Sequence, residues 1–118
     1  IRKIDVSDMN NPISTTVAGS GTAGTVDGIG ASASFNAPYI SVSNDGIDIL
    51  VIDTGGSVLR RFNPTSTEVK TVVGVDGQCG RVDGLLSVAR LCSPSKVIWT
   101  DDGIFITDSS SYAIRWIH

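Results

Sequence analysis

Residues 47–62, which read IDILVIDTGGSVLRRF, decide the fold of this chain. Residues 47–53 form an almost continuous apolar run, the pattern of a β-strand that is covered on both faces. Thr54, Gly55 and Gly56 are small residues that suit a tight turn, and residues 57–62 form a second strand. The stretch therefore predicts two consecutive short strands of an all-β chain.

Further short strands are expected on both sides of this stretch. Residues 39–43 alternate apolar and polar side chains, and Asn44, Asp45 and Gly46 then provide a turn that tolerates positive φ. Asn63 and Pro64 open another turn before the next strand. By the same patterns, strands are predicted at residues 1–5, 13–18, 68–73, 97–100, 104–108 and 112–117.

These strands recur in an internal repeat. Asp53 recurs as Asp108 and Arg60 as Arg115, each at an offset of 55 residues (108 − 53 and 115 − 60). At other matched positions the offset differs by one or two residues, and these differences fall in loops, where insertions are tolerated. The sequence is therefore divided into three parts. Residues 1–18 supply the third and fourth strands of a preceding unit, residues 19–73 form a first repeat with a long entry loop, and residues 74–118 form the first three strands of a second repeat.

Two long connections, residues 19–37 and 74–93, separate the strands. Each has a Gly-rich first half and then a short Ala/Ser segment, which predicts one helical turn with Phe35 or Leu91 packed inward. Pro38 and Pro94 then return the chain to an extended conformation.

Composition excludes several classes of function. The 12 acidic against 9 basic residues, with a formal net charge of −3, argue against a nucleic-acid partner. No run of about 18 apolar residues exists to insert into a membrane. One His and two Cys are too few for the usual zinc site, and His118 alone builds no catalytic Ser–His–Asp or Cys–His set. We therefore expect no catalytic residue, cofactor or metal ion, and no enzyme activity.

Several stretches of both repeats resemble the NHL repeat. They are residues 17–28, 33–38, 51–54 and 59–62 in the first unit, and residues 72–74, 82–84, 89–94, 106–108 and 114–117 in the second. The resemblance implies blades of a β-propeller, each with four antiparallel strands. The expected fold is thus all-β, with about two four-stranded NHL-type blades, and incomplete as a single chain because propellers use about four to eight.

Two such blades leave apolar faces and strand edges uncovered, which invites association. Three arrangements stay open at this point. The chain is a fragment of a longer propeller, a protomer whose copies complete a ring, or a unit of an open head-to-tail filament.

Cys79 and Cys92 lie in the second long connection and have no cysteine counterparts in the first. They form either a disulfide that closes the loop or two buried thiols. The disulfide is favoured because the pair is local and belongs to no CxxC motif. It implies an oxidising location, extracellular or in the lumen of the secretory pathway.

The aromatic residues Trp99, Tyr112 and Trp116 break the repeat. Aromatic residues that do not recur are candidate interface residues, since Trp and Tyr are enriched at binding hot spots. Core packing is the alternative for Trp99. The recurring Arg60 and Arg115, together with Arg2, instead predict an ion pair or hydrogen bond repeated between blades.

The predicted function is a non-catalytic interaction or structural module that binds a protein or glycan partner, or that self-assembles to complete the propeller. The alternative is a fragment of a larger NHL propeller enzyme or RNA-binding protein whose site residues lie outside this chain.

Overall fold

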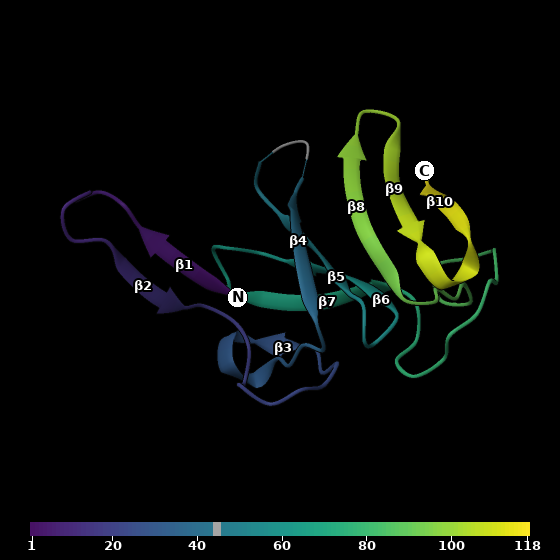
Figure 1. The fold of residues 1–118 in the computed structure, drawn as a ribbon, viewed down its shortest axis with the longest axis horizontal. Coiled ribbons are helices and arrows are strands. Elements are labelled where there is room, and N and C mark those ends of the chain that lie inside the picture. Colours follow the sequence, from purple (N-terminus) through teal and green to yellow (C-terminus); the bar gives the residue numbers. More distant parts are fainter. Residues whose placement is uncertain (44–45) are drawn as a thin grey trace.

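The computed structural model describes residues 1–43 and 46–118. Within this part of the chain there are ten β-strands and two short 3-10 helices, and no α-helix. The strands form three antiparallel sheets of two, five and three strands (Figure 1). The prediction of an all-β chain is confirmed. The turn predicted at Asn44 and Asp45 lies outside the described residues.

The five-stranded sheet occupies the middle of the molecule, in the order β3-β7-β6-β5-β4 (Figure 1). Its strands are β3 (Gly28–Ile29), β4 (Pro38–Val42), β5 (Ile49–Asp53), β6 (Val58–Phe62) and β7 (Glu68–Val73). The helix η1 (Gly30–Ser32) directly follows β3.

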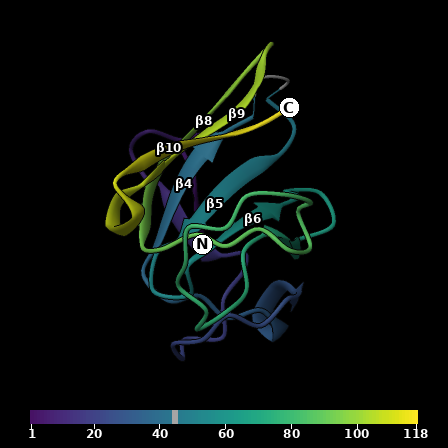
Figure 2. The same ribbon diagram turned by 90° about the vertical axis from the view of Figure 1, so that its right-hand side faces the viewer.

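The other two sheets lie at opposite ends of the molecule (Figure 1). One is a hairpin of β1 (Arg2–Asp5) and β2 (Ile13–Thr16). The other contains β8 (Pro94–Thr100), β9 (Gly103–Asp108) and β10 (Ala113–Ile117), with η2 (Ser109–Ser111) between its last two strands. Figure 2 shows this three-stranded sheet from its own end of the molecule, next to β4 and β5.

The prediction of four-stranded propeller blades is wrong. The sheets contain two, five and three strands, and they do not close into a ring. The fifth strand of the central sheet comes from the first long connection, for which no strand was expected. Gly28 pairs with Val69 and Ile29 with Glu68, so this connection extends the sheet beyond β7.

Two apolar clusters cover the two faces of the central sheet. The first lies between the central and the three-stranded sheet and is formed by Leu50, Ile52, Leu59, Val73, Ala89, Leu91, Val97 and Ile106. The second lies on the opposite face and is formed by Ala18, Ala33, Val51, Phe62 and Val69. β5 is thus covered on both faces, as its apolar run predicts.

The long connections follow the sequence prediction in part. In the first connection, the helical turn η1 covers Gly30–Ser32, at the start of the Ala/Ser segment, as predicted. In the second connection, the N–H groups of Val88 and Ala89 both donate to the Leu85 carbonyl oxygen and form a turn. Phe35 and Leu91 pack inward against the second and the first cluster, as expected.

Candidate interaction surface

Arg60 on β6 is a fully buried cation that joins the central sheet to the first long connection. Its Nη1 donates to the Ser34 carbonyl oxygen at 2.6 Å and to Asp53 Oδ2 at 3.2 Å. Its Nη2 donates to the Val26 carbonyl oxygen at 2.7 Å and to Asp27 Oδ1 at 2.8 Å. Since a buried guanidinium needs such partners to offset its desolvation, these contacts are structural.

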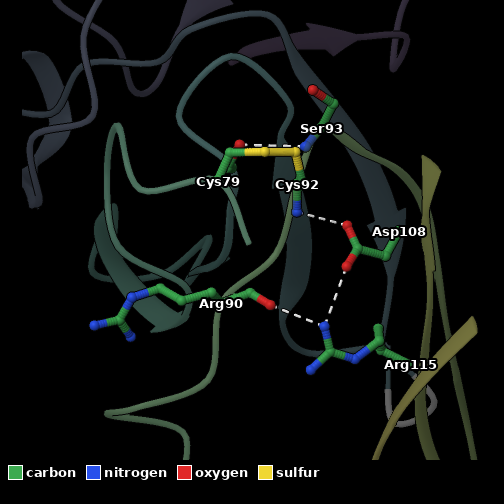
Figure 3. Close-up of a disulfide and its surroundings, with 7 residues drawn as sticks. Cys79, Arg90, Cys92, Ser93, Asp108 and Arg115 are labelled. Carbon is green, nitrogen blue, oxygen red and sulfur yellow. Dashed lines mark hydrogen bonds and ion pairs between the residues drawn. A yellow bond between two sulfur atoms is a disulfide. The ribbon is translucent and has the colours of Figure 1, made fainter. Parts of the chain in front are cut away.

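Arg115 on β10 makes the same set of contacts in the second repeat. Its Nη1 donates to the Arg90 carbonyl oxygen at 2.8 Å and to Asp108 Oδ2 at 3.1 Å (Figure 3). Its Nη2 donates to the Val82 carbonyl oxygen at 2.8 Å and to Asp83 Oδ1 at 2.7 Å. We call each set, centred on Arg60 or Arg115, an arginine clamp.

The clamps correct one expectation about the recurring arginines. The ion pairs with Asp53 and Asp108 join neighbouring strands of one sheet, β5 with β6 and β9 with β10. Those with Asp27 and Asp83 join a strand to a long connection, and none of the four joins two different sheets. Arg2 is exposed and makes no ion pair within residues 1–43 and 46–118.

The carboxyl group of Asp53 is held in a low-dielectric environment. Its Oδ1 accepts a hydrogen bond from the Asn36 N–H at 2.7 Å, and its Oδ2 faces Arg60. Burial raises the pKa of Asp53 above its ordinary value of 3.8, because desolvation of the carboxylate outweighs these favourable contacts.

Cys79 and Cys92 form a disulfide, which confirms the preferred prediction (Figure 3). Cys92 is buried, and its N–H donates to Asp108 Oδ1 at 2.6 Å. Asn36 occupies the matching place in the first repeat, where its N–H binds Asp53. The disulfide therefore anchors the second long connection beside the clamp of Arg115.

The outward face of the three-stranded sheet is apolar and exposed. Ile98, Phe105, Ile114 and Trp116 project from this face, and Phe105 lies in register with both Ile98 and Trp116. Ile98 and Ile114 remain 57% and 66% exposed. The rings of Phe105 and Trp116 stack with centroids 5.9 Å apart. A shallow groove of about 350 Å³ crosses the face beside Thr107.

The corresponding face of the central sheet is covered. Three of its positions precede three positions of the outward face by 55 residues: Leu50, Ile52 and Leu59 match Phe105, Thr107 and Ile114. All three side chains on the central sheet are buried beneath the three-stranded sheet. The outward face is thus equivalent to the face of the central sheet that packs against the three-stranded sheet, but here the face is exposed.

The predicted interface residues occupy different environments. Trp99 is partly buried and packs against the first cluster, so it belongs to the core. Trp116 is 53% exposed on the outward face, and its Nε1 donates to the Asp102 carbonyl oxygen at 2.9 Å. Tyr112 lies at the end of η2 and is almost fully exposed. A role of these residues in an interface stays a prediction.

The sequence analysis named none of Ile98, Phe105 and Ile114 as candidate interface residues. The signal that separates them from core residues is spatial: no sheet covers this face within residues 1–43 and 46–118. In the same part of the chain, no helix is long and apolar enough to span a membrane.

The fold and this surface define a class of all-β proteins built from packed antiparallel sheets. No family model matches the chain. Over 93 residues it is 30% identical to Protein SUPPRESSOR OF QUENCHING 1, chloroplastic, from Arabidopsis thaliana, a match that covers 77% of this chain and 9% of that protein. In structure it is similar to an auxiliary nutrient binding protein from Bacteroides ovatus, with a TM-score of 0.78 and 20% identity.

The structural match covers 96% of this chain and 31% of the Bacteroides ovatus chain. At this level of identity it shows a shared fold alone. The chain spans less than a third of the length of each of these two proteins.

The comparisons also correct the resemblance to the NHL repeat. No family model supports it, and the structural neighbour is described as a nutrient binding protein. Together with the sheets of two, five and three strands, these findings overturn the NHL assignment.

Proposed function

We propose that the chain is a non-catalytic interaction module that docks a further β-sheet on the outward face of its three-stranded sheet. One observation carries the proposal: Ile98 and Ile114 are exposed on a largely apolar face that also presents Lys96 and Thr107, whereas the matching face of the central sheet is buried under a neighbouring sheet. An exposed apolar face of this kind marks an interaction site.

The chemistry of the partner sheet follows from the contact that the molecule already contains. The central sheet is covered by branched and small side chains, with Val97 and Ile106 from the strands and Ala89 and Leu91 from the connection. A partner sheet with such a surface would bury the outward face in the same way. Each large apolar side chain then contributes about 1.5–3 kcal/mol on full burial.

The description of the structural neighbour as a nutrient binding protein supports a binding role for this chain. The disulfide supports a location in an oxidising environment, extracellular or in the secretory pathway, because such bonds persist there. We include this location and the absence of catalysis in the proposal.

An extended chain tests the docking face. A second copy of residues 64–118 is fused after His118, which corresponds to Asn63 at the offset of 55, so the added sheet follows in the register of the repeat. In the unextended chain, Ile114→Asp should lower the free energy of unfolding by about 1 kcal/mol, since it changes only strand propensity. In the extended chain, the same substitution at Ile114 of the original segment should lower the free energy of unfolding by about 2 kcal/mol more, because the carboxylate is then buried without a partner.

Ile29→Asp is the matched control, since Ile29 is as exposed as Ile114 but lies on β3, away from the outward face. Its cost should be the same in both chains. Urea unfolding followed by circular dichroism measures all four differences. An equal cost of Ile114→Asp in the two chains would contradict the proposed docking.

A further inference from the structure

A groove of about 510 Å³ lies between β4 and β8, where the central sheet meets the three-stranded sheet. The two strands lie side by side and run in the same direction (Figure 1). Each is the edge strand of its sheet, because β4 pairs only with β5 and β8 only with β9 among the described strands. Along the free edge of each strand, alternate residues therefore keep backbone N–H and C=O groups that no strand binds.

The free edges belong to the repeat itself. β4 and β8 are equivalent strands, since Pro38 pairs with Asp53 in the first repeat as Pro94 pairs with Asp108 in the second. Both strands are followed by the next strand of their own sheet, and each is preceded by its long connection. All of these neighbours are in place, and none of the described strands covers either edge. The groove is thus an internal feature of the contact between the two repeats.

The lining of the groove is half apolar and half polar. The apolar side chains are those of Ile40, Ile52, Val97 and Ile98, and the polar ones are those of Tyr39, Ser41, Ser95 and Lys96. Ile52 and Val97 are buried in the first cluster, whereas Tyr39 is 61% exposed. Lys96 is the one charged residue among the described residues of the lining. The groove therefore offers an apolar floor, one aromatic ring, hydroxyl groups and a single positive charge.

The polar groups of the groove are available to a ligand. Tyr39 stands on the face of β4 that meets the three-stranded sheet. In the part of the chain that the structure describes, neither the Tyr39 hydroxyl nor the Lys96 ammonium group has a hydrogen-bond or ion-pair partner. Ser95 Oγ lies 3.0 Å from Thr107 Oγ1 and 2.7 Å from Ser109 Oγ, which orients this hydroxyl and leaves one of its three hydrogen-bonding positions open.

We propose that this groove binds a sugar ring, with a preference for a sugar that carries a carboxylate. One face of a sugar ring consists of C–H groups, which suit the apolar floor and the electron-rich face of the Tyr39 ring. The hydroxyls at the rim of a sugar both donate and accept hydrogen bonds, as do the hydroxyls of Tyr39, Ser41 and Ser95. The groove volume of about 510 Å³ falls within the range of about 300–1,000 Å³ for small-ligand sites.

Lys96 sets the preference for an acidic sugar, because a carboxylate on the ligand meets this cation and no anion in the described lining. An ion pair in an open groove changes the affinity by at most about fivefold. The ring and the hydroxyls provide the remaining affinity, and we expect a dissociation constant of about 1 mM, since an open groove buries only part of one sugar ring. Phe105 and Ile114 of the outward face do not line the groove, so this inference does not rest on docking of a further sheet.

Methyl β-glucuronide and methyl β-glucoside are the probes, because they differ only in a carboxylate in place of a hydroxymethyl group. Titrated into the ¹⁵N-labelled chain, both should shift the amide resonances of β4 and β8 in a saturable way, and leave those of β1, β2 and β7 unchanged. The glucuronide should bind about three to five times more tightly than the glucoside. This difference should shrink at high salt, which screens an exposed ion pair.

Substitutions in the lining test the role of each residue. Tyr39→Ala should weaken both glycosides about tenfold, and Tyr39→Phe only about threefold, because phenylalanine keeps the ring and loses one hydrogen bond. Lys96→Gln should leave the affinity for the glucoside unchanged and lower that for the glucuronide to the same value. Tyr112→Ala and Lys70→Gln are the matched controls, since both residues are exposed and lie outside the groove, and these variants should bind both probes like the wild type.

Several results would overturn the proposal. One is the absence of a saturable shift at about 20 mM of either glycoside. Others are shifts that centre away from β4 and β8, and an equal loss of binding in the control variants. Benzoate carries the charge and a flat ring but no hydroxyls, so tighter binding of benzoate than of the glucuronide would make the groove a site for aromatic acids instead. The comparison of the two glycosides uses the unaltered chain and does not depend on the folding of any variant.

Discussion

Replacing Arg60 with methionine should destabilise the chain more than any other single change in the clamps. Methionine keeps most of the apolar stem and removes the guanidinium, so the change isolates the loss of charge and hydrogen bonds. The fully buried carboxylate of Asp53 then loses its ion-pair partner, and the Ser34 and Val26 carbonyl oxygens lose their donors. Removing one partner of a buried pair costs about 3–5 kcal/mol.

Arg115→Met is the matched comparison, because Arg115 makes the same contacts from a less buried position. Its side chain is 10% exposed, and one of its two carboxylate partners, Asp83, lies in solvent, whereas the other, Asp108, is as fully buried as Asp53. Its loss should therefore cost about 1–3 kcal/mol, the penalty for leaving buried acceptors without donors. Arg60→Met combined with Asp53→Asn should recover part of the loss, since no isolated charge remains.

Urea unfolding followed by far-ultraviolet circular dichroism gives the free energy of unfolding for each variant. The order expected is wild type, Arg115→Met, Arg60→Met, from most to least stable. A loss below about 1 kcal/mol for Arg60→Met would refute the reasoning, because exposed ion pairs reach only that value. If Arg115→Met lowered the free energy of unfolding more than Arg60→Met does, burial of the arginine could not be the cause of the difference between the two variants.

Three further outcomes follow from the same structure. Reduction of the Cys79–Cys92 disulfide, which closes a loop with a sequence separation of 13, should lower the free energy of unfolding by about 3 kcal/mol. Urea unfolding with and without reductant measures this difference. The variant with both cysteines replaced by serine is the control and should not respond to reductant. Gly74→Ala should cost about 2 kcal/mol or more, since φ is +95° and the new Cβ would lie 2.4 Å from a backbone oxygen, whereas Gly77→Ala meets no atom within 4 Å and should cost about 1 kcal/mol in the same assay. Because folding raises the pKa of Asp53, the folded chain binds more protons just above pH 3.8, so this group makes the free energy of unfolding fall as pH rises through that window. Asp53→Asn should remove this negative contribution when unfolding is measured between about pH 3 and 6, and a difference of the opposite sign would contradict the raised pKa.

Local patterns were enough to place nine of the strands. The apolar run of β5 is a local pattern, and the recurrence of the arginines can be read directly from the sequence. Both are therefore predicted from sequence alone. β3 is different, because Gly28 and Ile29 are too few to show any periodicity, and their partners on β7 lie 41 and 39 positions further along the chain (69 − 28 and 68 − 29). That missing strand is why the predicted count of four strands in a sheet failed.

The candidate surface was harder to predict than the fold. Leu59 and Ile114 are equivalent in sequence, yet one is buried and the other is 66% exposed. The difference depends on which sheet lies above them, and a strand pattern contains no information on that. Asp83 was likewise not singled out in the sequence, because its position beside the edge of β10 depends on the packing of the loop against that strand.

The arginine clamps also bear on how the chain acquires its structure as it leaves the ribosome. Every contact of Arg60 and Arg115 within its clamp reaches back no further than 34 residues along the chain. The contacts with Asp53 and Asp108 span only 7 residues, whereas the other clamp contacts span 25–34 residues and close larger loops at a larger entropic cost. Each clamp is complete once its arginine has been made, so the first repeat can close around Arg60 before the second has been synthesised. The position of the arginine after all its clamp partners therefore allows the two repeats to fold in the order in which they are translated.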